Sequence, residues 1–294
     1  TTGVNASLAV SRGAPIDGIH FSERSSHSAG DEVFICKRFL SATIDAVLTD
    51  ILTTIGIDVV YIPSTEWADE VSVWHSSTTV SALYVEAEDA NNVISQLLQS
   101  YLLDMWFDPV DRLIKLSAIS VWQSSSLTLV EGSEIDYESV KRSEQEDLRA
   151  TDALVVYSKA FKARDNSVEN YKKASFFSNS ALSSDDFYGE VKQKRFENNP
   201  IIDETAANLL VRRYVSRYGL TPQLYTWKTQ ENKLSFSTGD IVNLSTSSKV
   251  GFDGRPNSST RAQIISVKPN YNNLGRDYTV KGLTYDPAVT DGGA

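Results

Sequence analysis

Four short apolar segments near the end of the chain constrain its fold more than any other feature. They are QLYTWKT (residues 223–229), DIVNLST (240–246), RAQIISVKP (261–269) and DYTVKGLTYD (277–286). The connections between them are rich in Gly, Asn and Pro, the residues of tight turns. Strands this short and this closely spaced predict a small antiparallel barrel or sandwich. Within the series, Gly239 and Asp240 are expected to form the turn that leads into the second strand.

A helix precedes these strands, at residues 203–218. Asp203 is placed to cap its N-terminus, Gly219 to end it, and Pro222 prevents its continuation. Further upstream, DALVVYSKAF and FYGEVKQKRFE predict two strands, separated by a polar loop of roughly twenty residues. We therefore expect residues 151–290 to form one tube-type β-barrel domain that includes the helix.

Residues 36–122 show the pattern of a small, separate α+β domain. In SATIDAVLTDILTTIG, apolar residues recur at i, i+3 and i+4, which predicts an amphipathic helix. Ser41 is the expected N-cap of this helix, and Gly56 the residue just after its end. The segment TVSALYV, further along, predicts a strand.

The same domain contains a second helical pattern, in EDANNVISQLLQSYLLDMWF. Val93, Leu97, Tyr101 and Met105 form one apolar row of this predicted helix. The following stretch, MWFDPVDRLIKLSAI, predicts a hairpin with its turn at residues 108–111.

Two segments remain outside these domains. Residues 1–35 are rich in Ser and Gly and predict loop, with a strand at EVFICK. Residues 123–150 are rich in Ser and Glu and predict a connector between the domains. The sequence as a whole therefore predicts the α+β class: a small α+β domain plus an antiparallel β-barrel domain.

The charge balance disfavours a protein that wraps nucleic acid. The chain has 38 Asp and Glu against 28 Lys and Arg, a formal net charge of −10. Binding to a phosphate backbone needs clustered Lys and Arg. An acidic wall would instead let DNA slide past without sticking.

Residues that carry metal or nucleophilic chemistry are scarce. Cys36 is the single cysteine, which excludes an internal disulfide and any multi-cysteine metal site; its apolar neighbours favour a buried structural thiol over a nucleophile. His20, His27 and His75 have no histidine partner at helical spacing. His75 is the best placed of the three to act as a base, although a surface or interface histidine is favoured. We predict no catalytic, cofactor-binding or metal-binding residue.

Two groups of carboxylates next to aromatic residues suggest glycoside chemistry. Asp185, Asp186 and Glu190 lie around Tyr188, and Glu66, Asp69 and Glu70 lie around Trp67. Paired carboxylates hydrolyse glycosidic bonds. Chance clusters are expected in so acidic a chain and are the favoured explanation. The mixed run VKRSEQEDLR is either a solvated connector, which is favoured, or a charged contact with a neighbouring subunit.

The order of elements resembles the hub, or tail-tip, proteins of tailed bacteriophages. Three stretches carry the resemblance: IDAVLTDILTTIGI followed by YIPSTEW; NNVISQLLQSYLLDMWFDPVDRLIKLSAI; and the series LSFSTGDIVNLST, RAQIISVKPN and RDYTVKGLTYDP. Together they cover about residues 40–287. In such hubs each subunit contributes two barrel-like tube domains, so that three copies imitate the six-fold tail tube. Here one barrel is evident, and residues 1–35 are expected to add strands to an incomplete second one.

The resemblance implies a non-enzymatic structural protein of the virion tail tip. It implies a homotrimeric ring that closes or continues the tail tube and supports receptor-binding parts. The implied partners are the tail tube, distal tail and tip fibre proteins, with DNA only as transiting cargo and with no small-molecule substrate or cofactor. The closely spaced strand edges predict that the barrel, rather than the α+β domain, builds the ring.

Three alternatives stay open. One is a secretion-system spike hub, which shares the architecture. The second is a tail-associated carbohydrate-active enzyme that uses the acids near Tyr188. The third is a carbohydrate-binding module that uses Trp67 and Trp74.

Overall fold

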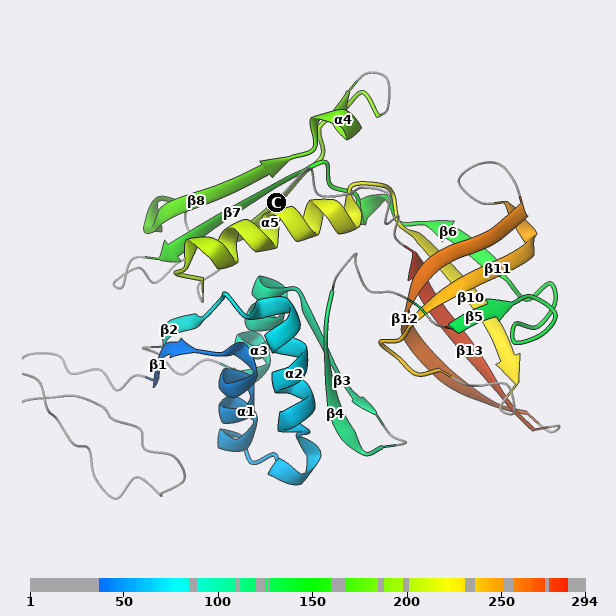
Figure 1. The fold of residues 1–294 in the computed structure, drawn as a ribbon, viewed down its shortest axis with the longest axis horizontal. Helices are drawn as coiled ribbons and strands as arrows, with labels where there is room; N and C mark the ends of the chain where they lie inside the picture. The colour runs from blue at the N-terminus through cyan, green and yellow to red at the C-terminus, as the bar shows by residue number, and fades with distance from the viewer. Residues whose placement is uncertain are drawn as a thin grey trace, which may run out of the picture.

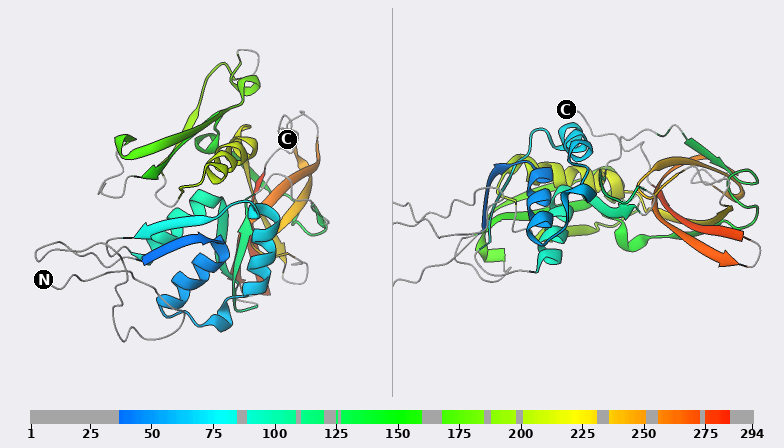
Figure 2. Two further views of the ribbon diagram at one scale, coloured as in Figure 1. Left: turned by 60° about the vertical axis from the view of Figure 1, so that its left-hand side comes forward. Right: turned by 90° about the horizontal axis from the view of Figure 1, so that it is seen from below.

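The computed structural model describes most of the chain as helices, strands and connections. The described residues are 37–84, 89–108, 111–119, 125, 127–159, 168–184, 188–197, 201–230, 236–250, 256–272 and 275–284. The expected N-terminal segment 1–35 lies outside them, as does nearly all of the expected strand EVFICK. Three parts are distinguished below: the helical unit (residues 37–119), the middle unit (146–219) and the curled sheet (127–144 with 223–284) (Figures 1 and 2).

The helical unit contains three helices, a two-stranded sheet and a hairpin. Its elements are β1 (Lys37–Ala42), α1 (Ile44–Thr54), η1 (Val59–Tyr61), α2 (Ser64–His75), β2 (Val80–Tyr84), α3 (Ala90–Tyr101), β3 (Leu103–Asp108) and β4 (Leu113–Ala118). Strand β1 pairs antiparallel with β2, and β3 pairs antiparallel with β4. The predicted strand at TVSALYV and the predicted hairpin are confirmed.

The ends of α1 and α3 refine the sequence prediction. Ser41 is not the N-cap of α1, because it lies in β1; Thr43 occupies that position. Gly56 does follow the end of α1, with a φ of 95° that favours glycine. Helix α3 ends where Leu102 adopts the left-handed conformation, with a φ of 49°. Met105 therefore lies in β3. The apolar row had placed Met105 in the helix, and that prediction is wrong.

Helix α2 was not predicted, although the sequence carries a signal for it. Trp67 and Val71 are its buried apolar residues, four positions apart, and Pro63 immediately precedes its first turn. Proline is favoured at such a start because its fixed φ suits the helix. The helix supplies one side of the core of the helical unit.

The middle unit is a three-stranded sheet covered by one long helix. It contains η2 (Glu146–Leu148), β7 (Asp152–Lys159), η3 (Val168–Asn170), β8 (Tyr171–Ser178), α4 (Ser180–Ser183), β9 (Gln193–Glu197) and α5 (Glu204–Tyr218). Strand β7 lies between β8, its antiparallel partner, and β9, its parallel partner. Asp203 caps α5 by accepting a hydrogen bond from the amide of Ala206 at 3.3 Å, as predicted.

The polar loop expected before residue 188 contains a strand instead. Residues 171–178 form β8 and pair with β7 along its length. Ser175 is buried while the flanking Ala174 and Phe176 are exposed, an alternation typical of a strand with one covered face. The Lys, Ser and Asn residues of this stretch obscured that pattern in the sequence.

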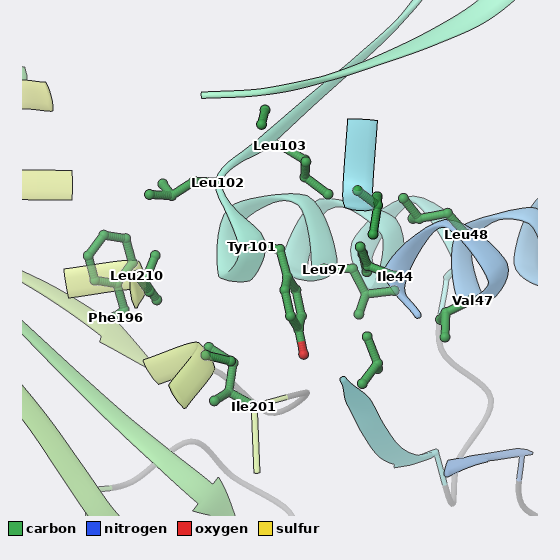
Figure 3. Close-up of a cluster of buried hydrophobic side chains, with 14 of the residues drawn as sticks. Ile44, Val47, Leu48, Leu97, Tyr101, Leu102, Leu103, Phe196, Ile201 and Leu210 are labelled. Atoms are coloured by element: carbon green, nitrogen blue, oxygen red, sulfur yellow. The ribbon is translucent and has the colours of Figure 1, made fainter. Parts of the chain in front are cut away.

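One hydrophobic core joins the helical unit to the middle unit. Ile44, Val47 and Leu48 of α1 lie on one side of it, and Phe196, Ile201 and Leu210 of the middle unit lie on the other (Figure 3). Leu97 and Tyr101 of α3 lie between the two groups (Figure 3). Residues 151–218, which the sequence assigned to the barrel domain, therefore pack in the same core as the helical unit.

The curled sheet has six strands in the order β5-β11-β12-β13-β10-β6. They are β5 (Leu127–Val130), β6 (Lys141–Glu144), β10 (Gln223–Gln230), β11 (Ile241–Val250), β12 (Pro256–Asn272) and β13 (Gly275–Thr284). Tyr225 and Trp227 of β10, Val242 and Leu244 of β11 and Ile264 of β12 point into its own core. The four predicted C-terminal strands are confirmed, as is the α+β class. The sheet curls into a half-barrel, and one pairing, β5 with β11, is parallel.

Both edge strands of the curled sheet come from the segment expected to be a connector. Strand β5 pairs with β11, and β6 pairs with β10. The residues between β5 and β6 bridge the two edges: the amide of Glu131 donates to the Ser245 carbonyl, and the amide of Asp136 donates to the Lys228 carbonyl. Ile135 of this bridge is buried in the core of the sheet. Because these pairings join positions about a hundred residues apart, local patterns in residues 123–150 did not reveal them.

Candidate functional site

His75, the histidine best placed for a catalytic role, is buried between the helical unit and the middle unit. It ends α2, and its Nε2 lies 3.5 Å from Nη1 of Arg213 on α5. Arg213 also donates to the carbonyl of Trp74, and the Tyr101 ring stands edge-on to the imidazole at 5.9 Å. Burial, together with the Arg213 charge, lowers the pKa of His75 to about 3. The imidazole is therefore neutral near pH 7, and its surroundings are those of a packing contact between two units.

The tryptophans considered for sugar binding are built into the core. Trp67 is 1% exposed, and its Nε1 donates to the Ile114 carbonyl at 3.0 Å. Trp74 is partly buried, with the Arg213 guanidinium 6.0 Å from its ring centre. Trp67 therefore offers no open ring face on which a sugar could stack.

The carboxylates around Trp67 hold the hairpin against α2. Glu70 accepts a hydrogen bond from the amide of Ala118 at 2.7 Å, and Glu66 forms an ion pair with Lys115 at 3.2 Å. Asp69 is exposed on the same helix. The structure thus gives Glu66 and Glu70 structural contacts and does not pair them across a cleft.

Of the second carboxylate group, the structure describes Glu190, while Asp185 and Asp186 lie outside the described residues. Glu190 accepts a hydrogen bond from Arg149, whose side chain is almost fully buried. Arg149 also forms an ion pair with Glu146 at 2.5 Å and lies over the Tyr188 ring, 4.1 Å from its centre. Glu190 therefore neutralises a buried arginine.

The contacts around Arg149 and Glu146 connect three segments of the chain that meet between the middle unit and the curled sheet. Glu146 follows β6, and it accepts a hydrogen bond from Thr221, which precedes β10, at 2.8 Å. Partial burial opposes ionisation of Glu146, but hydrogen bonds from Thr221 and Arg149 outweigh it and lower its pKa. The run VKRSEQEDLR thus makes internal contacts through Arg149 and Glu146. Their partners lie 41 and 75 residues away, so the run itself gave no signal of them.

The turn at Gly239 is a contact between the curled sheet and the helical unit. Gly239 has a φ of 96°, and a Cβ built on it would lie 2.2 Å from the ring of Trp106 on β3. A second contact to the curled sheet comes from α5, where Arg217 donates to Oε1 of Gln263 on β12 at 2.6 Å. Glycine is required at position 239 both by the backbone conformation and by the approach of the tryptophan.

Within the described ranges no cluster of three or more His, Cys, Asp or Glu could hold a metal ion. No helix there has the length and apolar composition needed to span a bilayer. Cys36, His20 and His27 lie outside the described residues.

Most of the acidic excess of the chain lies in the helical unit. Residues 39–111 contain no Lys or Arg and twelve acidic residues: Asp45, Asp50, Asp58, Glu66, Asp69, Glu70, Glu86, Glu88, Asp89, Asp104, Asp108 and Asp111. The two ranges of the curled sheet, 127–144 and 223–284, contain nine acidic and ten basic residues. Residues 146–219 contain eleven acidic and twelve basic residues. The helical unit therefore has a strong negative field that the other two lack.

Comparison with known proteins shows similarity in structure. No protein-family model matches the sequence, and no curated protein matches it. A chain from the virion of a native gene transfer agent particle aligns with 84% of this chain and 48% of its own length, at 13% identity and a TM-score of 0.53. The present chain thus spans about half the length of that protein.

Two bacterial tail proteins align over a similar range. The 43 kDa tail protein of prophage MuSo2 from Shewanella oneidensis matches 86% of this chain and 69% of its own, at 10% identity and a TM-score of 0.51. A tail protein from Neisseria meningitidis MC58 matches 85% of this chain and 69% of its own, at 8% identity and a TM-score of 0.51. At such identities the shared property is the fold. The predicted resemblance to phage tail proteins is confirmed at that level.

Proposed function

We propose that this chain is a structural protein of a phage-type tail and that three copies form a ring at the tail tip. The observation that carries the proposal is the fold shared with the two tail proteins over 85–86% of the chain. Fold alone does not determine function. The contacts of the candidate catalytic residues add support, because His75 packs between two units while Glu70 and Glu190 hold contacts within their own units.

In this proposal the ring closes or continues the tail tube and carries other tail proteins. The tail tube, the distal tail protein and the tip fibre are the expected neighbours, and DNA is transiting cargo. A conduit for DNA must not bind phosphate, because each Lys or Arg contact adds affinity. The curled sheet is close to neutral, so an acidic wall would have to come from residues 39–111.

The proposed location is tested by labelling the protein in purified particles. An antibody against the chain, detected by immunogold electron microscopy, should mark the tail end distal to the capsid. Label confined to the capsid, or absent from particles, would overturn the proposal. Label on contractile machines that lack capsid and DNA would favour the secretion-system spike instead.

The proposed stoichiometry has a separate test. The purified chain should have three times the monomer mass by light scattering. A stable monomer at every concentration would remove the ring from the proposal and leave the tail location to the labelling experiment.

A further inference from the structure

An exposed apolar loop joins α1 to α2. Ile55, Val59, Val60 and Tyr61 have between 44% and 66% of their surface exposed. They fall within seven residues, and together they are called the tip here. Single exposed apolar residues are ordinary, but a group of large ones close together marks an interaction site.

The tip projects from one end of the molecule. In Figure 1 the loop between α1 and α2 is the lowest part of the helical unit, and the left view of Figure 2 again shows it at the bottom. In both views no described helix or strand lies beyond it. Because the centres of interfaces pack with complementary shapes, a projecting surface is matched by a hollow on its partner.

Hydrogen bonds hold the backbone of the tip in one conformation. The amide of Val60 donates to the side chain of Asp58, and the amide of Tyr61 donates to the Asp58 carbonyl, both at 3.1 Å. The amide of Ile62 donates to the Val59 carbonyl at 3.0 Å, and the Ile62 side chain is buried in the core. A loop that is already ordered loses little conformational entropy when it binds.

The tip lies in the acidic part of the chain. Residues 45–118 contain twelve Asp and Glu and two basic residues, Arg112 and Lys115. Lys115 lies on β4, which packs against η1 of the tip. It is ion-paired with both Glu66 and Asp111, at 3.2 and 3.1 Å. The surroundings of the tip are therefore strongly negative.

This charge selects among the classes of partner. Nucleic acids and anionic lipids both carry phosphate, and both bind proteins through Lys and Arg. An apolar tip in acidic surroundings is repelled by either one. A protein surface with an apolar hollow and basic residues around it attracts the tip, since complementary charges steer association and exclude wrong partners.

A second copy of the chain lacks the opposite charge. The middle unit has eleven acidic and twelve basic residues over 146–219, and the curled sheet has nine and ten over its two ranges. Both are close to neutral, and the helical unit is itself acidic. The complementary field therefore has to come from a different protein.

We propose that the tip docks in an apolar hollow, edged by Lys and Arg, on a different protein of the tail. The inference rests on the proposed tail function and names one surface through which the chain joins its neighbours. Val59 and Val60, which are 65% and 66% exposed, fill the hollow. The acidic residues of the helical unit face its basic edge.

The proposal is tested in assembled particles with a photo-crosslinking residue. Benzoylphenylalanine is placed at position 60, and at position 73 as the control, since Val73 is 67% exposed but lies on α2, away from the loop. Irradiated particles should give a cross-link from position 60 to another tail protein, identified by mass spectrometry, and none from position 73. Binding of the purified chain to the protein so identified should weaken with rising salt, and by about thirtyfold or more with Val60→Asp, as expected at the centre of an interface.

The outcomes separate the alternatives. A cross-link to another copy of this chain, or a yield at position 60 no higher than at position 73, overturns the proposal. Binding that salt leaves unchanged, or that survives Val60→Asp in a variant shown by circular dichroism to be folded, overturns it too.

A membrane partner has its own measurement. Flotation of the chain with vesicles of phosphatidylcholine and phosphatidylglycerol, lost in Val60→Asp, would assign the tip to a bilayer and overturn the proposal; absence of flotation is the expected result. Failure of the proposed function is seen separately, because immunogold label would then be absent from tails. Labelled tails without the cross-link overturn only this contact.

Discussion

Acidification from pH 7 to pH 5 should destabilise this protein through His75. The pKa of this imidazole is lowered from 6.5 to about 3 by burial and by Arg213. Between those values the unfolded chain binds a proton that the folded chain does not, so stability falls as pH falls. With 1.36 kcal/mol per pKa unit, the linkage relation gives a loss of about 2 kcal/mol between pH 7 and pH 5. That loss is a large part of the stability of a typical domain.

The effect is isolated by comparing the wild type with His75→Gln. Unfolding in urea, followed by tryptophan fluorescence at both pH values, gives the free energy of unfolding of each protein. The wild type should lose about 2 kcal/mol more than the variant over this interval. The other titrating groups are present in both proteins and cancel in the difference. An equal loss in the two proteins, or an imidazole NMR signal of His75 that titrates near pH 6.5, would refute the reasoning.

Two further predictions concern how the units are joined. Gly239→Val should reduce the free energy of unfolding by about 2–4 kcal/mol, because a side chain there combines a disfavoured φ with a clash against Trp106. Urea unfolding checks this, and adding Trp106→Ala should recover the part of the loss due to the clash; no recovery would contradict the contact. Residues 37–119 expressed alone should melt without a cooperative transition by circular dichroism, because the core they share with α5 and β9 would be open. A sharp transition at the temperature of the whole chain would show that the helical unit folds independently.

The sequence predicted best the elements whose signals are local. Helix α5 has its cap at Asp203 and a wide apolar face, and β10 alternates buried and exposed residues along its length. Such patterns depend on neighbours within a few positions, so one sequence suffices to find them. The hairpin of β3 and β4 was predictable for the same reason.

What the sequence did not predict depends on partners far along the chain. Strands β5 and β6 are four residues each and gain their stability from β11 and β10, which follow about a hundred residues later. The packing of α5 against the helical unit likewise has no local signal in the sequence. Helix α2 is the exception: its signal was present but weak, with Trp67 and Val71 among charged residues.

The contacts of the candidate site residues also depend on partners far along the chain. His75 was singled out for its chemistry, yet its role is set by Arg213, 138 residues away. Glu190 was considered as an acid and proves to be the partner of Arg149. The sequence alone does not show whether the partner of a carboxylate or an imidazole is a substrate or a distant arginine.

The placement of β5 and β6 has a consequence for how the chain is made. Both strands are synthesised before the whole middle unit and before the other four strands of the curled sheet, β10 to β13. The half-barrel cannot form until synthesis reaches residue 284, where β13 ends, because β13 connects β12 to β10. The helical and middle units, whose shared core is complete by residue 218, are free to fold first. Completion of the half-barrel is thus a late step, tied to the end of translation of this segment, and truncated chains are left with two strands that have no sheet to join.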